Sequence, residues 1–261
     1  MRVSSIQFSI ESGKPDHNFS TVKRLVEKAV QSSQAPDVIL LPELWSTGYA
    51  LRHCAELSSP SGEREANFLG ELAVQYHVAF AGGSVLAEEN GRFFNRAQVI
   101  DSSGQYIAWY DKIHLFGPMG EGAYLAPGGK RLVFTLMGMP CSCLICYDLR
   151  FGELWTKLRA EGVQTVFISA EWPMSRQLHW KTLLQARAVE HQIFIVACNR
   201  CGSSAHEIFA GQSLIAAPTG EILAQGGSTE EILSASIEQK FLLDTRSSFP
   251  VFQDRRPELY L

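Results

Sequence analysis

The sequence predicts an α/β fold in which helices cover a buried sheet. Short apolar runs of strand length alternate with longer segments whose apolar residues recur at helical spacing. The 261 residues are 46% hydrophobic and 19% charged, a composition typical of globular proteins. No linker rich in Pro, Gly or Ser divides the chain, so we expect a single domain over residues 1–261.

The first half of the chain is expected to run strand, helix, strand, helix and hairpin. A strand at 3–10 precedes a helix whose apolar residues share one face, and Asp16 or Asn18 can cap its start. Further elements are expected as a buried strand at 37–41, a helix around 65–76, and strands at 77–89, 92–101 and 104–112.

The second half repeats this alternation. Strands are expected near Leu132 and Cys141, at 164–170 and at 193–199, and helices at 151–161 and 176–190. Continuous apolar strands between amphipathic helices predict that the sheet is buried on its helix-covered face.

Charge and hydropathy exclude several classes of partner. A net charge of -4 and a pI near 6.0, with no cluster of four or more Lys and Arg, provide no basic surface for nucleic acid or anionic lipid. No segment approaches the roughly 18 apolar residues of a membrane span, and residues 1–13 do not read as a signal peptide. Six cysteines without such a signal indicate reduced thiols, so we expect a cytoplasmic protein.

The segment "CSCLICYDLRFGELW" places three cysteines within six residues. If it begins as a strand, Cys141 and Cys143 share one face and Cys146 points to the other, so the three thiols cannot bind one metal ion. Cys141 and Cys143 are expected as core residues. Cys146 ends the apolar run at a strand end, where ligands bind in α/β folds, and is a candidate nucleophile, with burial in the core as the alternative.

A cysteine nucleophile needs a base or a positive neighbour, because its thiol is only partly ionised at neutral pH. Glu43 follows the apolar run "VILLP", where burial would raise its pKa and suit it to proton transfer. Lys112 ends the strand of "YIAWYDKIHLF". Each could alternatively be a solvated surface charge.

Taken together, these segments resemble the nitrilase superfamily of carbon–nitrogen hydrolases. The resemblance covers nearly the whole chain and includes "LPELWSTGY" around Glu43, "YDKIHLF" around Lys112 and "LICYDLRFGELW" around Cys146. "HLFGPMGEGAYLAPG", "SAEWPMSRQLHWKTLLQARAVEHQ" and "AGQSLIAAPTGEIL" are most similar to the bacterial omega-amidase branch. The resemblance implies a four-layer α-β-β-α sandwich that commonly forms a homodimer, and residues 249–260 resemble the terminal segment that crosses that dimer.

The resemblance also implies the site and its chemistry. Cys146 attacks the amide carbonyl, Glu43 transfers protons, and Lys112 with the backbone N–H of Tyr147 stabilises the oxyanion. Glu121 matches the additional active-site Glu of the family, with an exposed loop charge as its alternative. A thiol, a carboxylate and an ammonium perform every step, so we expect no metal and no organic cofactor.

An omega-amide of a keto-dicarboxylic acid carries a carboxylate opposite its scissile amide, and an Arg fork matches a carboxylate. Arg176 and Arg200 follow strand ends and are the candidates, although either could form a structural salt bridge. Trp172 could wall the pocket or pack against a partner subunit. Glu171 would disfavour an anionic ligand unless an Arg pairs with it.

Other functions remain open at this point. An N-carbamoyl amide hydrolase, an aliphatic amide hydrolase or a nitrilase of the same superfamily would use the same thiol. A catalytically silent scaffold would be expected to lack Glu43, Lys112 or Cys146. A redox sensor would instead use Cys143 and Cys146 as a reversible disulfide pair.

Overall fold

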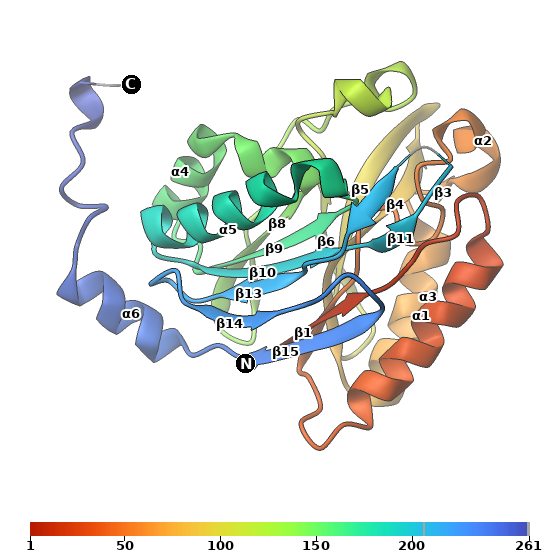
Figure 1. Ribbon diagram of the computed structural model, residues 1–261. Coiled ribbons are helices and arrows are strands. Elements are labelled where there is room, and N and C mark those ends of the chain that lie inside the picture. Colours follow the sequence, from red (N-terminus) through yellow and green to blue (C-terminus); the bar gives the residue numbers. More distant parts are fainter. Residues whose placement is uncertain (206, 260–261) are drawn as a thin grey trace.

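The computed structural model describes residues 1–205 and 207–259. Two large mixed sheets stack face to face in this part of the chain, and helices cover both outer faces, which gives an α-β-β-α sandwich (Figure 1). The α/β prediction and its four layers are confirmed.

The first sheet has the strand order β15-β1-β2-β4-β5-β6, with β3 beside β4. Its strands are β1 (Arg2–Gln7), β2 (Val38–Leu40), β3 (Ser59–Pro60), β4 (Ala79–Glu89), β5 (Arg92–Ile100), β6 (Tyr106–Asp111) and β15 (Glu231–Ser236). The central strands β1, β2 and β4 are parallel, whereas β5, β6 and β15 are antiparallel to their neighbours. The predicted β5–β6 hairpin is confirmed.

The second sheet has the order β14-β13-β10-β9-β8-β7. Its strands are β7 (Phe134–Leu136), β8 (Met139–Ile145), β9 (Thr165–Ala170), β10 (Phe194–Asn199), β13 (Leu214–Ala216) and β14 (Ile222–Gln225). Again the three central strands, β8, β9 and β10, are parallel. Beside the sheets, β11 (Cys201–Ser203) pairs with β12 (Ile208–Ala210).

Amphipathic helices close the two outer layers. On the first sheet lie α1 (Pro15–Val30) and α3 (Glu63–Tyr76), and on the second lie α4 (Gly152–Ala160) and α5 (Gln177–His191) (Figure 1). Outside these layers are α2 (Cys54–Leu57) and α6 (Gln239–Ser248). None of the helices in the described residues is long and apolar enough to cross a membrane.

The two sheets make close contact through a glycine pair in β4. The backbone N–H of Gly83 donates to Ser169 Oγ of β9 at 2.7 Å. Gly83 adopts a φ of +87°, and a Cβ there would lie 2.8 Å from Leu41, so only glycine fits without strain. This contact brings the carboxyl ends of β2 and β9 together, where the site forms.

Two local expectations differ from the structure. Neither Asp16 nor Asn18 caps α1, which begins with Pro15 after Lys14; Asn18 is instead buried and bonds the backbone of Glu11 and Ser46. The sequence also predicts no strand or helix beyond residue 199, whereas β13, β14 and β15 lie there and complete both sheets.

Candidate active site

Glu43 lies at the carboxyl end of β2, in a tight turn. Leu44, directly after it, has a φ of +45°, and its N–H donates to Ser84 Oγ at 2.9 Å. Another backbone N–H, that of Glu171 after β9, donates to Glu43 Oε2 at 2.8 Å. Both sheets therefore position this carboxylate, which is wholly buried.

Lys112 follows β6 and extends its ammonium group into the same buried space. Its Nζ lies 2.7 Å from Oε1 of Glu43 and 2.7 Å from Oε1 of Glu121. Burial acts to lower the pKa of Lys112, but the two carboxylates outweigh it and the pKa is raised. The lysine is therefore a fixed positive charge, and the alternative of a solvated surface lysine is excluded.

Glu121 is also wholly buried and begins the short helix η3 (Glu121–Ala123). Its Oε2 accepts the backbone N–H of Phe116 at 2.5 Å, which fixes the loop between β6 and β7. Burial raises the pKa of Glu121, Lys112 opposes that rise, and Glu43 adds to it. The exposed loop charge considered as the alternative is ruled out.

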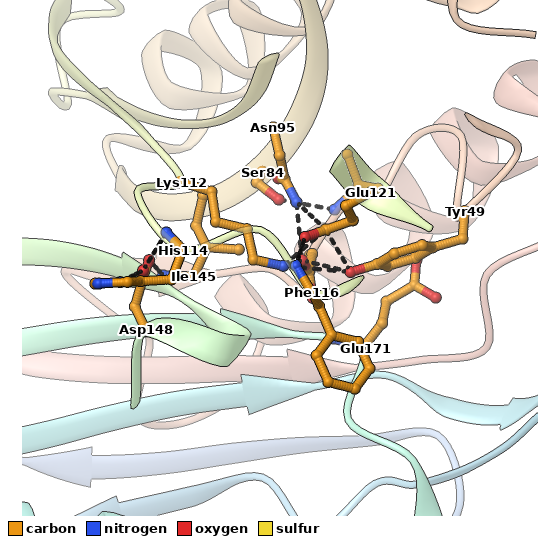
Figure 2. Close-up of polar contacts among 12 residues, drawn as sticks. Tyr49, Ser84, Asn95, Lys112, His114, Phe116, Glu121, Ile145, Asp148 and Glu171 are labelled. Carbon is orange, nitrogen blue, oxygen red and sulfur yellow. Dashed lines mark hydrogen bonds and ion pairs between the residues drawn. The ribbon is translucent and has the colours of Figure 1, made fainter. Parts of the chain in front are cut away.

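Tyr49 and Asn95 complete this cluster, and sequence reasoning missed both. Tyr49 Oη lies 2.9 Å from Glu43 Oε1 and 2.8 Å from Glu121 Oε1. Asn95 Nδ2 donates to Glu43 Oε1 at 2.8 Å and lies 3.4 Å from Glu121 Oε1. Figure 2 shows Tyr49, Asn95, Lys112 and Glu121 converging on one point. Two buried carboxylates thus share one ammonium and two neutral donors.

Cys146 lies where β8 ends and the short helix η4 (Cys146–Arg150) begins. Its φ is +46°, a left-handed conformation that a non-glycine residue adopts at a cost and that often marks a functional position. Burial raises the pKa of the Cys146 thiol well above its ordinary value, and the nearby carboxylate of Glu43 raises it further. The resting thiol is therefore protonated and requires a base.

Asp148 holds this turn against the strand that carries Lys112. Its Oδ2 accepts the hydroxyl of Tyr110 at 2.8 Å and the N–H of Ile145 at 3.1 Å. Its Oδ1 accepts the backbone N–H of His114 at 3.1 Å and lies 2.7 Å from His114 Nδ1 (Figure 2). One buried carboxylate thus ties the nucleophile turn to the segment around Lys112.

A small pocket of about 240 Å³ opens onto Cys146. That volume includes solvent at the open mouth, so the enclosed space beside the thiol is smaller still. The lining residues are Phe116, Cys146, Tyr147, Arg150, Glu171, Trp172, Pro173 and Arg176. The sequence-predicted Tyr147, Trp172 and Arg176 are thus brought together around the thiol.

Trp172 forms part of the pocket wall and is held there by contacts with two arginines. The Arg150 guanidinium lies 4.7 Å from the centre of the indole ring, and the indole N–H donates to the backbone oxygen of Arg176 at 2.9 Å. Arg176 itself lies 5.4 Å from the ring of Phe116. Two guanidinium groups therefore stand at the pocket, including Arg150, which sequence reasoning did not consider.

Arg200 lies elsewhere. It is almost wholly buried and does not line the pocket; its Nη1 donates to Glu171 Oε2 at 2.7 Å and its Nη2 to the backbone oxygen of Ile10 at 2.6 Å. Of the two expectations for Arg200, the geometry supports the structural salt bridge. This salt bridge also gives Glu171 the Arg partner without which its carboxylate would disfavour an anionic ligand.

The other thiols show no comparable arrangement. All six cysteines are free, and burial raises the pKa of Cys143 well above its ordinary value. Redox-sensing cysteines are accessible and have a low pKa, so the geometry does not favour a Cys143–Cys146 redox pair. Chemically, the site offers one thiol beside one proton-accepting carboxylate and one fixed cation, a combination suited to acyl transfer.

Comparison with known proteins agrees with this arrangement. A sequence model described as carbon-nitrogen hydrolase matches residues 2–246. A 2-oxoglutaramate amidase of Bacillus subtilis (strain 168) is 43% identical over 258 residues, which cover 99% of this chain and 98% of the relative.

Solved structures show the same fold. A CN-hydrolase superfamily protein of Xanthomonas campestris, with an arsenic adduct in its active site, matches with a TM-score of 0.90 at 28% identity, over 98% of this chain and 97% of that one. A mutant amidase from Nesterenkonia sp. AN1 carries the acetamide moiety of fluoroacetamide covalently at its active-site cysteine. It matches with a TM-score of 0.88 at 27% identity, over 100% of this chain and 95% of that one.

Proposed function

The chain belongs to the carbon-nitrogen hydrolase family, and from this premise we propose that it hydrolyses the terminal amide of a small keto-dicarboxylic acid to the acid and ammonia. The observation that carries this proposal is the thiol of Cys146, held in a strained turn at a small pocket beside the buried pair of Glu43 and Lys112. The name of the 43% identical relative, a 2-oxoglutaramate amidase, supports the substrate class.

In the first half of the reaction, Glu43 accepts the thiol proton while Cys146 Sγ bonds to the amide carbon. The carbonyl oxygen becomes negatively charged, and Lys112 with the backbone N–H of Tyr147 stabilises it. Preformed donors of this kind contribute about 10²- to 10³-fold each. Glu43 then donates its proton to the nitrogen, the C–N bond breaks, and ammonia leaves behind a thioester.

In the second half, Glu43 removes a proton from water and the resulting hydroxide attacks the thioester carbon. The same donors stabilise the second oxyanion. The C–S bond then breaks, the acid is released and the proton on Glu43 returns to Cys146 Sγ. One water is consumed for each amide, and Glu121 keeps Lys112 in place through both halves.

The substrate carboxylate is assigned to Arg176, with Trp172 as the pocket wall. The pocket position of Arg176 supports this assignment, whereas the buried pairing of Arg200 with Glu171 argues for a supporting role of Arg200 in holding Glu171. Arg150 provides a second positive charge at the same wall.

Ammonia release from a small panel tests the function: the omega-amide of a keto-dicarboxylic acid, glutamine, an N-carbamoyl amino acid and a simple aliphatic amide. A preference of tenfold or more in kcat/KM for the first is the expected result. Preference for the N-carbamoyl amino acid or for the aliphatic amide would assign the chain to the corresponding neighbouring branch. No release from any member would contradict the proposal and favour a silent scaffold.

Domain organisation, cellular compartment and assembly are part of the same proposal. Residues 1–261 act as one domain, because strands of both sheets supply the site. Six free thiols suit a reducing cytoplasm. The segment after α6 runs away from the sandwich (Figure 1) and exposes Phe249 and Leu259, which suits an intersubunit contact in a homodimer. Of the expected dimer segment, residue 260 lies outside the described part of the chain. Light scattering in solution checks this assembly.

A further inference from the structure

Glu171 is a wholly buried carboxylate at the pocket that takes no part in the steps above. Its two oxygens differ. Oε2 accepts from Arg200 Nη1 at 2.7 Å, whereas Oε1 is buried and has no hydrogen-bond partner among the described residues. An unpaired buried acceptor carries a free-energy cost, so a partner arriving with the substrate would relieve it.

Arg200 fixes which oxygen remains open. Its guanidinium is held by the backbone oxygen of Ile10 at 2.6 Å and lies 4.2 Å from the ring centre of Phe209. This rigid cation anchors Oε2 and balances the negative charge of Glu171. The carboxylate can therefore stand beside a neutral group of the substrate without adding net negative charge to the pocket.

Glu171 also lies directly beside the proton-transferring residue. Its own backbone N–H donates to Glu43 Oε2 at 2.8 Å. The nitrogen that departs from the carbonyl attached to Cys146 must reach Glu43 to be protonated. That nitrogen consequently comes next to Glu171, and it brings two N–H donors in a primary amide.

We propose that Glu171 Oε1 accepts a hydrogen bond from the N–H of the scissile amide and so selects primary amides over esters of the same acid. This inference rests on the proposed amidase function. The hydrogen bond turns the nitrogen lone pair toward Glu43, which supplies the proton, and Glu171 neither gains nor loses one. An ester oxygen at the same place carries no hydrogen and is repelled by the carboxylate.

The test compares kcat/KM for the omega-amide with that for the methyl ester of the same acid. Glu171→Gln keeps the size of the side chain and an acceptor for Arg200, but directs an NH₂ group toward the substrate. The amide-to-ester ratio is expected to fall about tenfold or more, as for loss of a hydrogen bond to a charged group. A structural role alone would lower both activities together and leave the ratio unchanged.

Two further variants serve as controls for this test. Glu171→Gln leaves the buried Arg200 without a charged partner, and the double variant Glu171→Gln with Arg200→Gln removes that cation as well. If the single variant folds poorly, the double variant takes its place, and its amide-to-ester ratio should be lowered in the same way. Glu65→Gln neutralises another wholly buried carboxylate, which is bound by Ser46, Ser59 and Arg64 and does not line the pocket, and this variant should keep the wild-type ratio.

The outcomes separate the two hypotheses. Equal loss on amide and ester, or an unchanged ratio in both Glu171 variants, overturns the assignment of Glu171 while the amidase function stands. Wild-type protein that releases no ammonia from any amide overturns the proposed function itself, whatever the variants show.

Discussion

The ammonium of Lys112 lies 2.7 Å from Oε1 of Glu43, and both side chains are wholly buried. The pair is one positive and one negative charge removed from water, and Glu121 adds a second negative charge at the same distance. Removing one partner of a buried pair leaves an uncompensated charge, which is more costly than the pair itself.

Replacing the cation should therefore affect stability and catalysis together. Lys112→Met is expected to destabilise the fold by roughly 3–5 kcal/mol and to lower kcat at least about 10²-fold, because an oxyanion donor is also lost. Urea unfolding and steady-state kinetics measure the two effects. Lys112→Met with Glu43→Gln should recover part of the stability but no activity; a single variant that keeps a tenth of wild-type kcat would contradict the assignment.

Tyr49 donates one hydroxyl proton to either of two carboxylate oxygens, at 2.9 and 2.8 Å. Tyr49→Phe removes this donor without changing the ring, and kcat should fall roughly 10- to 100-fold, as for a hydrogen bond to a charged group. The acidic limb of the kcat/KM profile should move to higher pH, because the anionic form of the cluster loses stabilisation. Tyr124→Phe, at a side chain that is 41% exposed, is the control and should keep both the rate and the profile.

Arg176 is expected to act on binding of the substrate carboxylate. Arg176→Gln should raise KM for the omega-amide about tenfold or more, while KM for a simple aliphatic amide changes little, because that substrate has no carboxylate to lose. Lys181→Gln removes an exposed positive charge from α5 and provides the matched control. An equal rise in KM for both substrates would show that Arg176 shapes the pocket instead.

His191 makes the fold sensitive to acid. Burial lowers the pKa of His191 from 6.5 to about 4, with Glu190 opposing the shift. The unfolded chain therefore binds a proton between these values and the folded chain does not, so stability is lost as pH falls from 6.5 toward 4, by about 3 kcal/mol in total. Denaturant unfolding at several pH values should show that the free energy of unfolding falls less steeply with decreasing pH in His191→Gln than in the wild-type protein. The variant His53→Gln, whose native side chain is 61% exposed, should retain the wild-type slope.

The strand ends that carry Glu43, Lys112 and Cys146 could be predicted because each follows a continuous apolar run, and such runs read as buried strands. Glu121 followed only from the resemblance, since its loop carries no periodic signal. Asn95 could not be found in this way: it lies within a strand, 52 residues from Glu43, and only the pairing of the strands directs its amide at the cluster.

The assignment of Arg200 shows a second limit. A strand-end position is shared by ligand-binding and structural arginines, and local sequence does not distinguish them. For Arg200 the structural role is set by Glu171, 29 residues earlier, and by the backbone of Ile10, which lies after β1. Three segments distant in sequence determine where that guanidinium points.

Hydrolysis through a thioester on Cys146 can be observed by mass spectrometry of protein quenched in acid during turnover of the omega-amide. We expect an acyl adduct on the Cys146 peptide of the wild-type protein. Cys146→Ala should show no adduct and lose at least about 10⁴-fold in turnover, whereas Cys143→Ala should retain most of the activity. Full ammonia release by Cys146→Ala, or an adduct on a different residue, would contradict the thioester mechanism.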